Sequence, residues 1–157
     1  MSDRCLLIGD IGGTNARFAL ATPDRPGYHS VVELRCEDFA TADDAISHYL
    51  DTINADSPDA VCLAAAGPIV DDTVKITNNH WDISEADTIE DYGIENDRLL
   101  NVFTAIAYSI PLLTETVVRS IGSHDHDWLP KGTYSVDKLG PCTGLGVAGR
   151  CRRDVTG

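Results

Sequence analysis

Short apolar runs separated by polar, glycine-rich turns dominate the first third of the chain. Residues 5–9 and 16–21 are apolar runs too short for helices, and residues 29–35 show partial alternation of apolar and polar side chains. These three segments predict strands. The period then changes, because apolar side chains between residues 45 and 53 recur at the spacing of one helix face, with Thr41 before them as the expected N-cap. The pattern therefore predicts three strands followed by a helix.

Strands and helices alternate in the next part of the chain. The apolar run at residues 60–70 predicts a buried strand that ends in Gly67-Pro68, residues 73–79 predict a further short strand, and residues 99–100 end another. Residues 85–92 predict a polar helix, and residues 103–113 predict a more apolar one. Apart from the short strand, the order is β-β-β-α-β-α-β-α. This order favours an α/β layered fold over a helical bundle or a β-sandwich.

A glycine-rich turn joins the first two predicted strands, in the stretch IGDIGGTNARFALA at residues 8–21. A P-loop or a dinucleotide-binding turn leads into a helix, whereas a strand follows here, and neither GxGxxG nor GK[ST] is present. The turn is therefore a β-turn-β hairpin with Asp10 at the end of its first strand. Its backbone N–H groups could form an anion site, although an ordinary hairpin turn has a similar composition. A second such turn, GPCTGLGVA, occupies residues 140–148.

The charge of the chain excludes several kinds of partner. The net charge is −13 and the pI is near 4.5, so nucleic acid and anionic membrane surfaces are poor partners. The acid is mostly Asp, and Lys75, Lys131 and Lys138 are the only lysines. This composition is typical of proteins from salt-rich environments, but an ordinary acidic domain can also have it, and both interpretations stay open.

Several other features bear on location and on metal binding. No apolar run approaches the ~20 residues that span a bilayer, and residues 1–4 do not resemble a signal peptide, so we expect the cytoplasm. The five cysteines are scattered and never form CxxC, which predicts neither a disulfide framework nor a zinc site. The stretch HDHD at residues 124–127 could bind a metal, but a solvated linker is the more economical interpretation.

The composition also predicts a domain organisation in three parts. Residues 1–122 form a small α/β domain that carries the first glycine-rich turn, and residues 123–132 form a polar linker. Residues 133–157 follow the linker and carry the second glycine-rich turn.

Five motifs, in this order, resemble bacterial glucokinases: GDIGGTNARFAL, AAAGPI, TNNHWDIS, NVFTAIAYSIP and GPCTGLGVA. The resemblance implies an actin-like ATPase (ribonuclease H-like) fold, with a βββαβα small domain and the first strands of a second one. It also implies transfer of the γ-phosphoryl group of ATP to the 6-hydroxyl of glucose with Mg²⁺, and a possible homodimer in the full-length family.

The resemblance assigns roles to residues that match the family's motifs. The first phosphate loop corresponds to Gly9, Asp10, Ile11, Gly12, Gly13 and Thr14, and the second to Thr143 and Gly144. Asp10 is expected to orient Mg²⁺ through bound water. The sugar cleft corresponds to Gly67, Pro68, Asn78, Asn79 and Asn101. Asparagine both donates and accepts hydrogen bonds, which suits sugar hydroxyls, but turn chemistry is a serious alternative for Asn78 and Asn79.

Three departures from the family limit the function that can be expected. Val102 stands where the family has the Asp that accepts the proton of the attacking hydroxyl, and valine cannot accept a proton. Cys142 stands where the family usually has Gly, and the chain ends at Gly157, before most of the second domain. The sequence therefore predicts a glucokinase-like chain that is inactive or impaired, with no catalytic residue assigned. The alternative is a non-catalytic remnant that binds a sugar or a partner.

Overall fold

The computed structural model describes residues 4–94, 97–114, 116–121, 132–141 and 145–153. The chain divides into two compact units, Met1–Val102 and Phe103–Gly157, and each is described by itself. The domain limits expected from the sequence stay a prediction, because most of the predicted linker at residues 123–132 lies outside the described residues.

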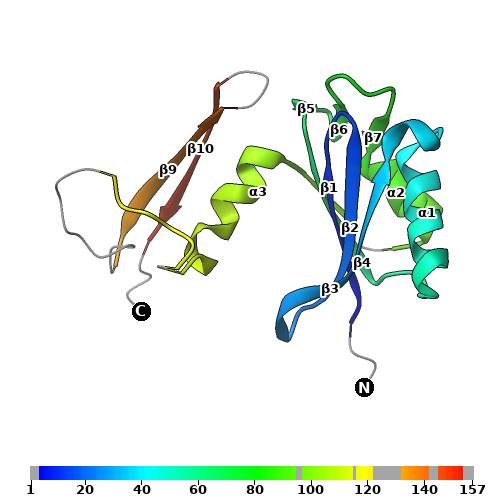
Figure 1. Ribbon diagram of the computed structural model, residues 1–157, viewed down its shortest axis with the longest axis horizontal. Helices are drawn as coiled ribbons and strands as arrows, with labels where there is room; N and C mark the ends of the chain where they lie inside the picture. Colours follow the sequence, from blue (N-terminus) through cyan, green and yellow to red (C-terminus); the bar gives the residue numbers. More distant parts are fainter. Residues whose placement is uncertain (1–3, 95–96, 115, 122–131, 142–144, 154–157) are drawn as a thin grey trace. The chain divides into compact units, whose positions relative to one another are not determined.

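The first unit is built on a five-stranded sheet with the strand order β3-β2-β1-β4-β8. These strands are β1 (Leu6–Ile11), β2 (Asn15–Thr22), β3 (Arg25–Arg35), β4 (Ala60–Ala65) and β8 (Asp97–Asn101). Strand β2 runs antiparallel to β1 and β3, whereas β4 runs parallel to both β1 and β8. Helices α1 (Ala42–Ile53) and α2 (Glu85–Tyr92) lie on the same side of this sheet (Figure 1). The predicted α/β layered fold is confirmed.

The core of this unit lies on one face of the sheet, because successive side chains of a strand point to opposite faces. Leu7 and Ile11 of β1 and Leu63 of β4 are fully buried there, together with Ile46 and Tyr49 of α1. The apolar stripe that predicted α1 is thus the stripe that packs on the sheet.

Helix α1 begins, and helix α2 ends, at a residue suited to that position. Thr41 Oγ1 accepts a hydrogen bond from Asp44 N at 3.0 Å, and Asp44 Oδ2 accepts one from Thr41 N at 3.1 Å. This reciprocal capping box satisfies two backbone donors at the start of α1. Helix α2 ends at Gly93, whose φ of 61° is the left-handed conformation that glycine adopts without strain. The cap at Thr41 and the helix over residues 85–92 are confirmed.

The buried strand that the sequence predicted to end in Gly67-Pro68 ends slightly earlier, at Ala65. Strand β4 ends at Ala65, and Gly67 N donates a hydrogen bond to Ala65 O at 3.1 Å as the chain turns. The residues after the turn form β5 (Ile69–Val70), which pairs with a different sheet. Gly67 and Pro68, the predicted end of the strand, thus lie in the connection between β4 and β5.

The predicted strand at residues 73–79 is also too long. Strand β6 (Thr73–Lys75) stops early, and Asn78 has a φ of 63°, a left-handed conformation that cannot continue a strand. Strands β5, β6 and β7 (Asp82–Ser84) form a small antiparallel sheet of three strands.

The helix predicted at residues 103–113 is shorter and begins one residue earlier. Helix α3 (Val102–Ser109) gives way to a 3₁₀ turn (Ile110–Leu112), because Pro111 lacks the N–H that a continuing helix needs. None of the helices in the described part of the chain is long and apolar enough to cross a membrane.

The second unit contains a hairpin that packs on α3. Its strands are β9 (Tyr134–Pro141) and β10 (Leu145–Arg152), which pair antiparallel. The strands on either side of the second glycine-rich turn are thus confirmed, while Cys142, Thr143 and Gly144 lie outside the described residues. The ring of Phe103 lies where a Cβ on Gly146 would have to be, and Lys138 Nζ lies 3.5 Å from the centroid of that ring. A cation at this distance is attracted by the face of the ring.

Stability is expected to rise with ionic strength, because carboxylates outnumber basic groups 25 to 12. The N-terminal turn of α1 and the adjacent α2 contribute Asp43, Asp44, Asp87 and Asp91 to this excess. Salt shortens the Debye length from ~30 Å at 0.01 M to ~3 Å at 1 M, which screens the repulsion. Thermal unfolding at pH 7.5, followed by circular dichroism, should give a higher Tm in 1 M NaCl than in 0.01 M NaCl.

The same pair of measurements at pH 4 provides the control. Partial protonation of the carboxylates removes part of the repulsion, so the gain in Tm should be smaller at pH 4 than at pH 7.5. A Tm at pH 7.5 that is flat or falls with salt would contradict the expectation.

Candidate functional site

The first phosphate loop predicted from the sequence is the tight turn between β1 and β2. Gly12 N donates a hydrogen bond to Asn15 O at 2.9 Å and closes the turn. A Cβ on Gly13 would lie 2.8 Å from Thr77 O, so the loop backbone approaches the β6–β7 connection more closely than a side chain allows. The N–H groups of Gly13 and Thr14 donate to no described residue. Two adjacent free donors on an exposed loop are suited to an anion.

Two segments from elsewhere in the chain hold this turn. Cys36 N donates to Thr14 O at 2.9 Å, and Cys36 Sγ lies 3.7 Å from Gly12 O. Asn79 Nδ2 donates to the same Gly12 carbonyl at 3.4 Å. Burial raises the pKa of the Cys36 thiol, so at neutral pH it is a protonated packing group and not a nucleophile.

A pocket of about 450 Å³ lies beside the turn. It is lined by Gly13, Thr14, Cys36, Glu37, Asn78, Asn79 and His80. It thus brings two predicted phosphate-loop residues together with two predicted sugar-cleft residues. Cys36, Glu37 and His80 were not predicted as site residues. His80 lies in the motif TNNHWDIS beside Asn79, whereas Cys36 and Glu37 lie in none of the motifs and reach the pocket through the tertiary fold.

Asp10 is not among the residues that line this pocket. It alternates with the buried Ile11 on β1, so its side chain points to the opposite face of the sheet and is 58% exposed. Arg17 Nη1 lies 3.7 Å from Asp10 Oδ2, while the same guanidinium makes two shorter contacts to Glu33, at 3.1 and 3.3 Å. The pairing of Arg17 with Asp10 is therefore the looser one, and the Asp10 oxygens stay accessible.

The remaining predicted sugar-cleft residues gather at the carboxyl ends of the parallel strands. In the sheet register, Ile11 of β1 pairs with Ala65 of β4, and Ala65 pairs with Asn101 of β8. Asn101 Nδ2 donates to Gly67 O at 2.8 Å, across the ends of two neighbouring strands. Pro68 follows in the same loop and is exposed.

Close backbone packing also fixes this loop. A Cβ on Gly67 would come within 2.5 Å of Lys75 O, so this position requires glycine. Val102, which stands at the predicted base position, follows Asn101 directly and is half-buried. Ligands of open α/β sheets bind outside the carboxyl ends of the strands, which is where these loops lie.

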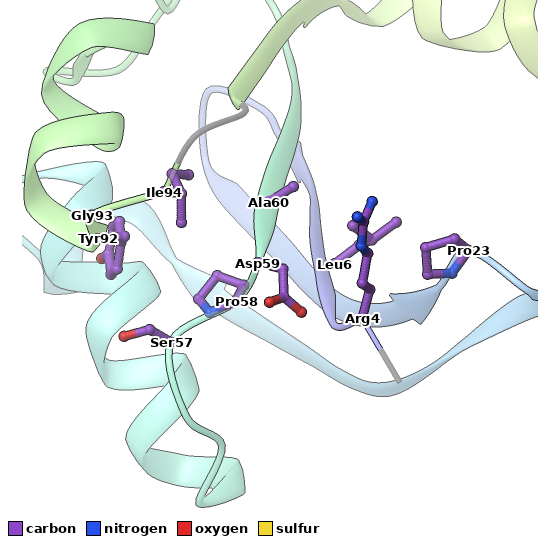
Figure 2. A pocket seen from close by; sticks show the side chains of 10 residues that line it. All are labelled: Arg4, Leu6, Pro23, Ser57, Pro58, Asp59, Ala60, Tyr92, Gly93 and Ile94. Atoms are coloured by element: carbon purple, nitrogen blue, oxygen red, sulfur yellow. The ribbon is translucent and has the colours of Figure 1, made fainter. Parts of the chain in front are cut away.

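A larger pocket, of about 600 Å³, lies at the opposite edge of the sheet (Figure 2). Figure 2 shows Arg4, Leu6 and Pro23 on one side of it and Tyr92, Gly93 and Ile94 on the other. Asp59 at its centre already accepts a hydrogen bond from Cys5 N at 2.7 Å, which joins β1 to β4. This pocket contains none of the predicted site residues, and it lies at the amino end of β1. We therefore place the candidate site at the other edge.

No group of three or more His, Cys, Asp or Glu side chains that could hold a metal ion occurs among the residues the structure describes. The HDHD stretch at residues 124–127 lies outside them.

One carboxyl group of the first unit has a strongly shifted pKa. Burial, followed by repulsion from Glu85, raises the pKa of Asp97 to about 6. Asp97 begins β8 and so lies at the opposite end of that strand from Asn101. Its carboxylate accepts a hydrogen bond from Arg98 N at 2.6 Å. The ionised carboxylate of Asp97 therefore lowers the stability of the folded chain, and Asp97 is not part of the candidate site.

Asp97→Asn is expected to stabilise the protein at pH 7.5 and to have little effect at pH 4. The folded chain binds a proton at Asp97 more tightly than the unfolded chain does, so its free energy of unfolding falls as pH rises from about 4 through about 6. Asparagine keeps an oxygen for Arg98 N and carries no charge. Urea unfolding at both pH values measures the difference, with the exposed Asp56→Asn as the control. An equal effect of Asp97→Asn at both pH values would contradict the assignment.

The five-stranded sheet, with the glycine turn between β1 and β2, belongs to an actin-like ATPase fold, which the chain shares with solved glucokinases. A glucokinase from an Antarctic psychrotroph has a TM-score of 0.80 and 33% identity, over 95% of this chain and 47% of that one. Glucokinase from Balamuthia mandrillaris, solved with glucose, has a TM-score of 0.60 at 21% identity, over 94% and 44% of the two chains.

A family model described as Glucokinase matches residues 7–156, and the chain belongs to the glucokinase family. The glucokinase of Chromohalobacter salexigens is 41% identical over 146 residues, which are 93% of this chain and 44% of that protein. The glucokinase of Caulobacter vibrioides is 43% identical over 150 residues, which are 94% of this chain and 44% of that protein. The chain thus spans less than half the length of the curated relatives it matches.

Proposed function

We propose that the chain carries the first phosphate loop and part of the sugar cleft of an enzyme that phosphorylates glucose with ATP. The observation that carries this proposal is the alignment of Ile11, Ala65 and Asn101, which gathers three predicted ligand-binding loops at one edge of the sheet. Family membership supports sugar phosphorylation in general, and the specificity for glucose is part of the proposal.

The residues present fit a nucleotide phosphate and Mg²⁺. The free N–H groups of Gly13 and Thr14, with the exposed Thr14 hydroxyl, suit phosphate oxygens. The accessible Asp10 carboxylate suits Mg²⁺, which keeps most of its waters and binds few protein oxygens. Magnesium would supply neutralisation of the charge that develops on the phosphoryl group. The second phosphate loop, at Thr143 and Gly144, stays part of the proposal.

We further propose that this chain transfers phosphate poorly or not at all. Val102 has no atom that could accept the proton of an attacking hydroxyl, and a positioned base contributes about 10²–10⁴ in rate. A non-catalytic sugar- or partner-binding protein is the second candidate, and Val102 is the observation that favours it. A location in the cytoplasm and a homodimer of the full-length protein belong to the same proposal.

Isothermal titration and a coupled assay for glucose 6-phosphate test these proposals together. Glucose should bind the 157-residue chain with or without Mg-ATP, while the assay should stay at the level of a control without protein. Turnover well above that control would overturn the proposed impairment. If the chain bound neither glucose nor Mg-ATP, the proposed sites would be overturned.

A further inference from the structure

Two adjacent asparagines, Asn78 and Asn79, have different surroundings although the sequence presents them as a pair. Asn78 is exposed, has a φ of 63°, and its side chain bonds to no described residue. Asn79 is half-buried, and both ends of its amide are engaged. Its Nδ2 donates to Gly12 O at 3.4 Å, and its Oδ1 accepts from Trp81 N at 3.2 Å.

The orientation of the Asn79 amide follows from its partners. Trp81 N can only donate, so it requires the amide oxygen, and Gly12 O can only accept, so it requires the amide nitrogen. The Trp81 end of this chain of bonds is firmly anchored. Trp81 is 1% exposed, and its Nε1 donates to Phe39 O at 3.1 Å. Asn79 therefore links a buried anchor to the carbonyl of Gly12.

The direction of the Gly12 carbonyl determines the direction of the next N–H. The peptide bond is planar and trans, so the C=O of Gly12 and the N–H of Gly13 point in opposite directions. Gly13 has no Cβ to restrict its backbone, so this peptide could rotate unless its carbonyl is held. The hydrogen bond from Asn79 to Gly12 O, together with the Cys36 thiol 3.7 Å from the same oxygen, thus keeps the Gly13 N–H turned away from the β6–β7 connection.

We propose that Asn79 is a positioning residue of the phosphate loop, which holds the Gly12–Gly13 peptide in the orientation that presents the Gly13 N–H to a phosphate, while Asn78 alone is left to contact a sugar. This role rests on the proposed function. It differs from the role that the family resemblance gave Asn79, because each end of the Asn79 amide already bonds to a backbone group.

Matched variants at the two positions test the proposal in the 157-residue chain. Asn79→Asp keeps an oxygen for Trp81 N but replaces the donor to Gly12 O with an oxygen that repels it. Asn78→Asp adds the same charge one residue away. Amide hydrogen exchange of Gly12 and Cys36, whose N–H groups close and hold the turn, should become about tenfold faster in Asn79→Asp. It should change less than about twofold in Asn78→Asp.

Binding of two probes separates positioning from general damage. Tripolyphosphate should bind Asn79→Asp about tenfold more weakly than it binds Asn78→Asp, because both variants add one negative charge to this loop but only Asn79→Asp loses the bond to Gly12. Glucose should bind Asn79→Asp as it binds the parent chain, and Asn78→Asp more weakly. Near-ultraviolet circular dichroism of Trp81 checks the fold, and Asn79→Ser replaces Asn79→Asp if the latter does not fold.

Equal exchange rates in the two variants would overturn the role of Asn79, as would weaker glucose binding by Asn79→Asp. If the parent chain binds neither tripolyphosphate nor glucose, the proposed function fails. The exchange rates still decide whether Asn79 holds the turn in that case.

Discussion

Val102→Asp is expected to raise kcat for glucose phosphorylation by about 100-fold or more, once the chain is extended with the remaining length of a glucokinase relative. Position 102 begins α3 directly after β8, so a carboxylate there lies at the strand ends that carry Asn101 and face Gly67. The N-terminal end of a helix favours the ionised form of a carboxyl group by about 0.3–1 kcal/mol. Valine and aspartate are nearly the same size, so the half-buried site need not repack.

The matched control is Val102→Asn in the same extended chain. Asparagine has the shape of aspartate but cannot accept the proton, so its kcat should stay near that of the Val102 form. In the 157-residue chain, Val102→Asp should leave the rate at background. Equal kcat values for the Asp and Asn variants of the extended chain would mean that residue 102 does not occupy the base position.

Trp81→Ala is expected to lower the free energy of unfolding by about 3–5 kcal/mol, which is the usual cost of removing a large buried aromatic ring. The indole is 1% exposed in the core and also donates to Phe39 O, so the variant loses both packing and a hydrogen bond. Because small domains have about 5–15 kcal/mol of stability in total, a large part of the folded population could be lost. Urea unfolding followed by far-ultraviolet circular dichroism measures the change.

Two comparisons separate the contributions at this position. Trp81→Phe keeps most of the apolar volume and removes the Nε1 donor. It should cost less than Trp81→Ala, and Phe39 O would keep His80 Nε2 at 2.9 Å as a partner. Val70→Ala removes an apolar side chain that is 64% exposed and should change stability by less than about 0.5 kcal/mol. A cost for Trp81→Ala as small as that of Val70→Ala would contradict the role of Trp81 as an anchor.

Local signals predicted those parts of the fold that depend on local interactions. The Thr41 cap, the helix over residues 85–92 and the strands around the first glycine turn all follow from neighbouring residues. The strand end at Lys75 did not follow, because the apolar Ile76 beyond it continues the pattern while the backbone turns. Periodicity reports burial and does not distinguish a strand from a buried turn.

The candidate site shows the same division. The spacing of the glycines was enough to locate Gly12 and Gly13, because a backbone that approaches its neighbours closely requires glycine in the sequence. Cys36 lies in none of the motifs, because its position beside the turn comes from a contact between distant segments. The difference between Asn78 and Asn79 could not be predicted either, since it depends on one backbone angle and on the place of Trp81.

The fit between Phe103 and the β9–β10 hairpin sets a rule for building chimaeras of this chain. A side chain at position 146 would collide with the ring of Phe103, and that ring belongs to the residue directly after Val102. A grafted segment could replace the hairpin and bring a residue other than glycine to position 146. Such a graft would shift the first turn of α3, and with it the side chain at position 102. The junction of an extended chain should fall after β10, so that positions 102, 103 and 146 come from the same parent.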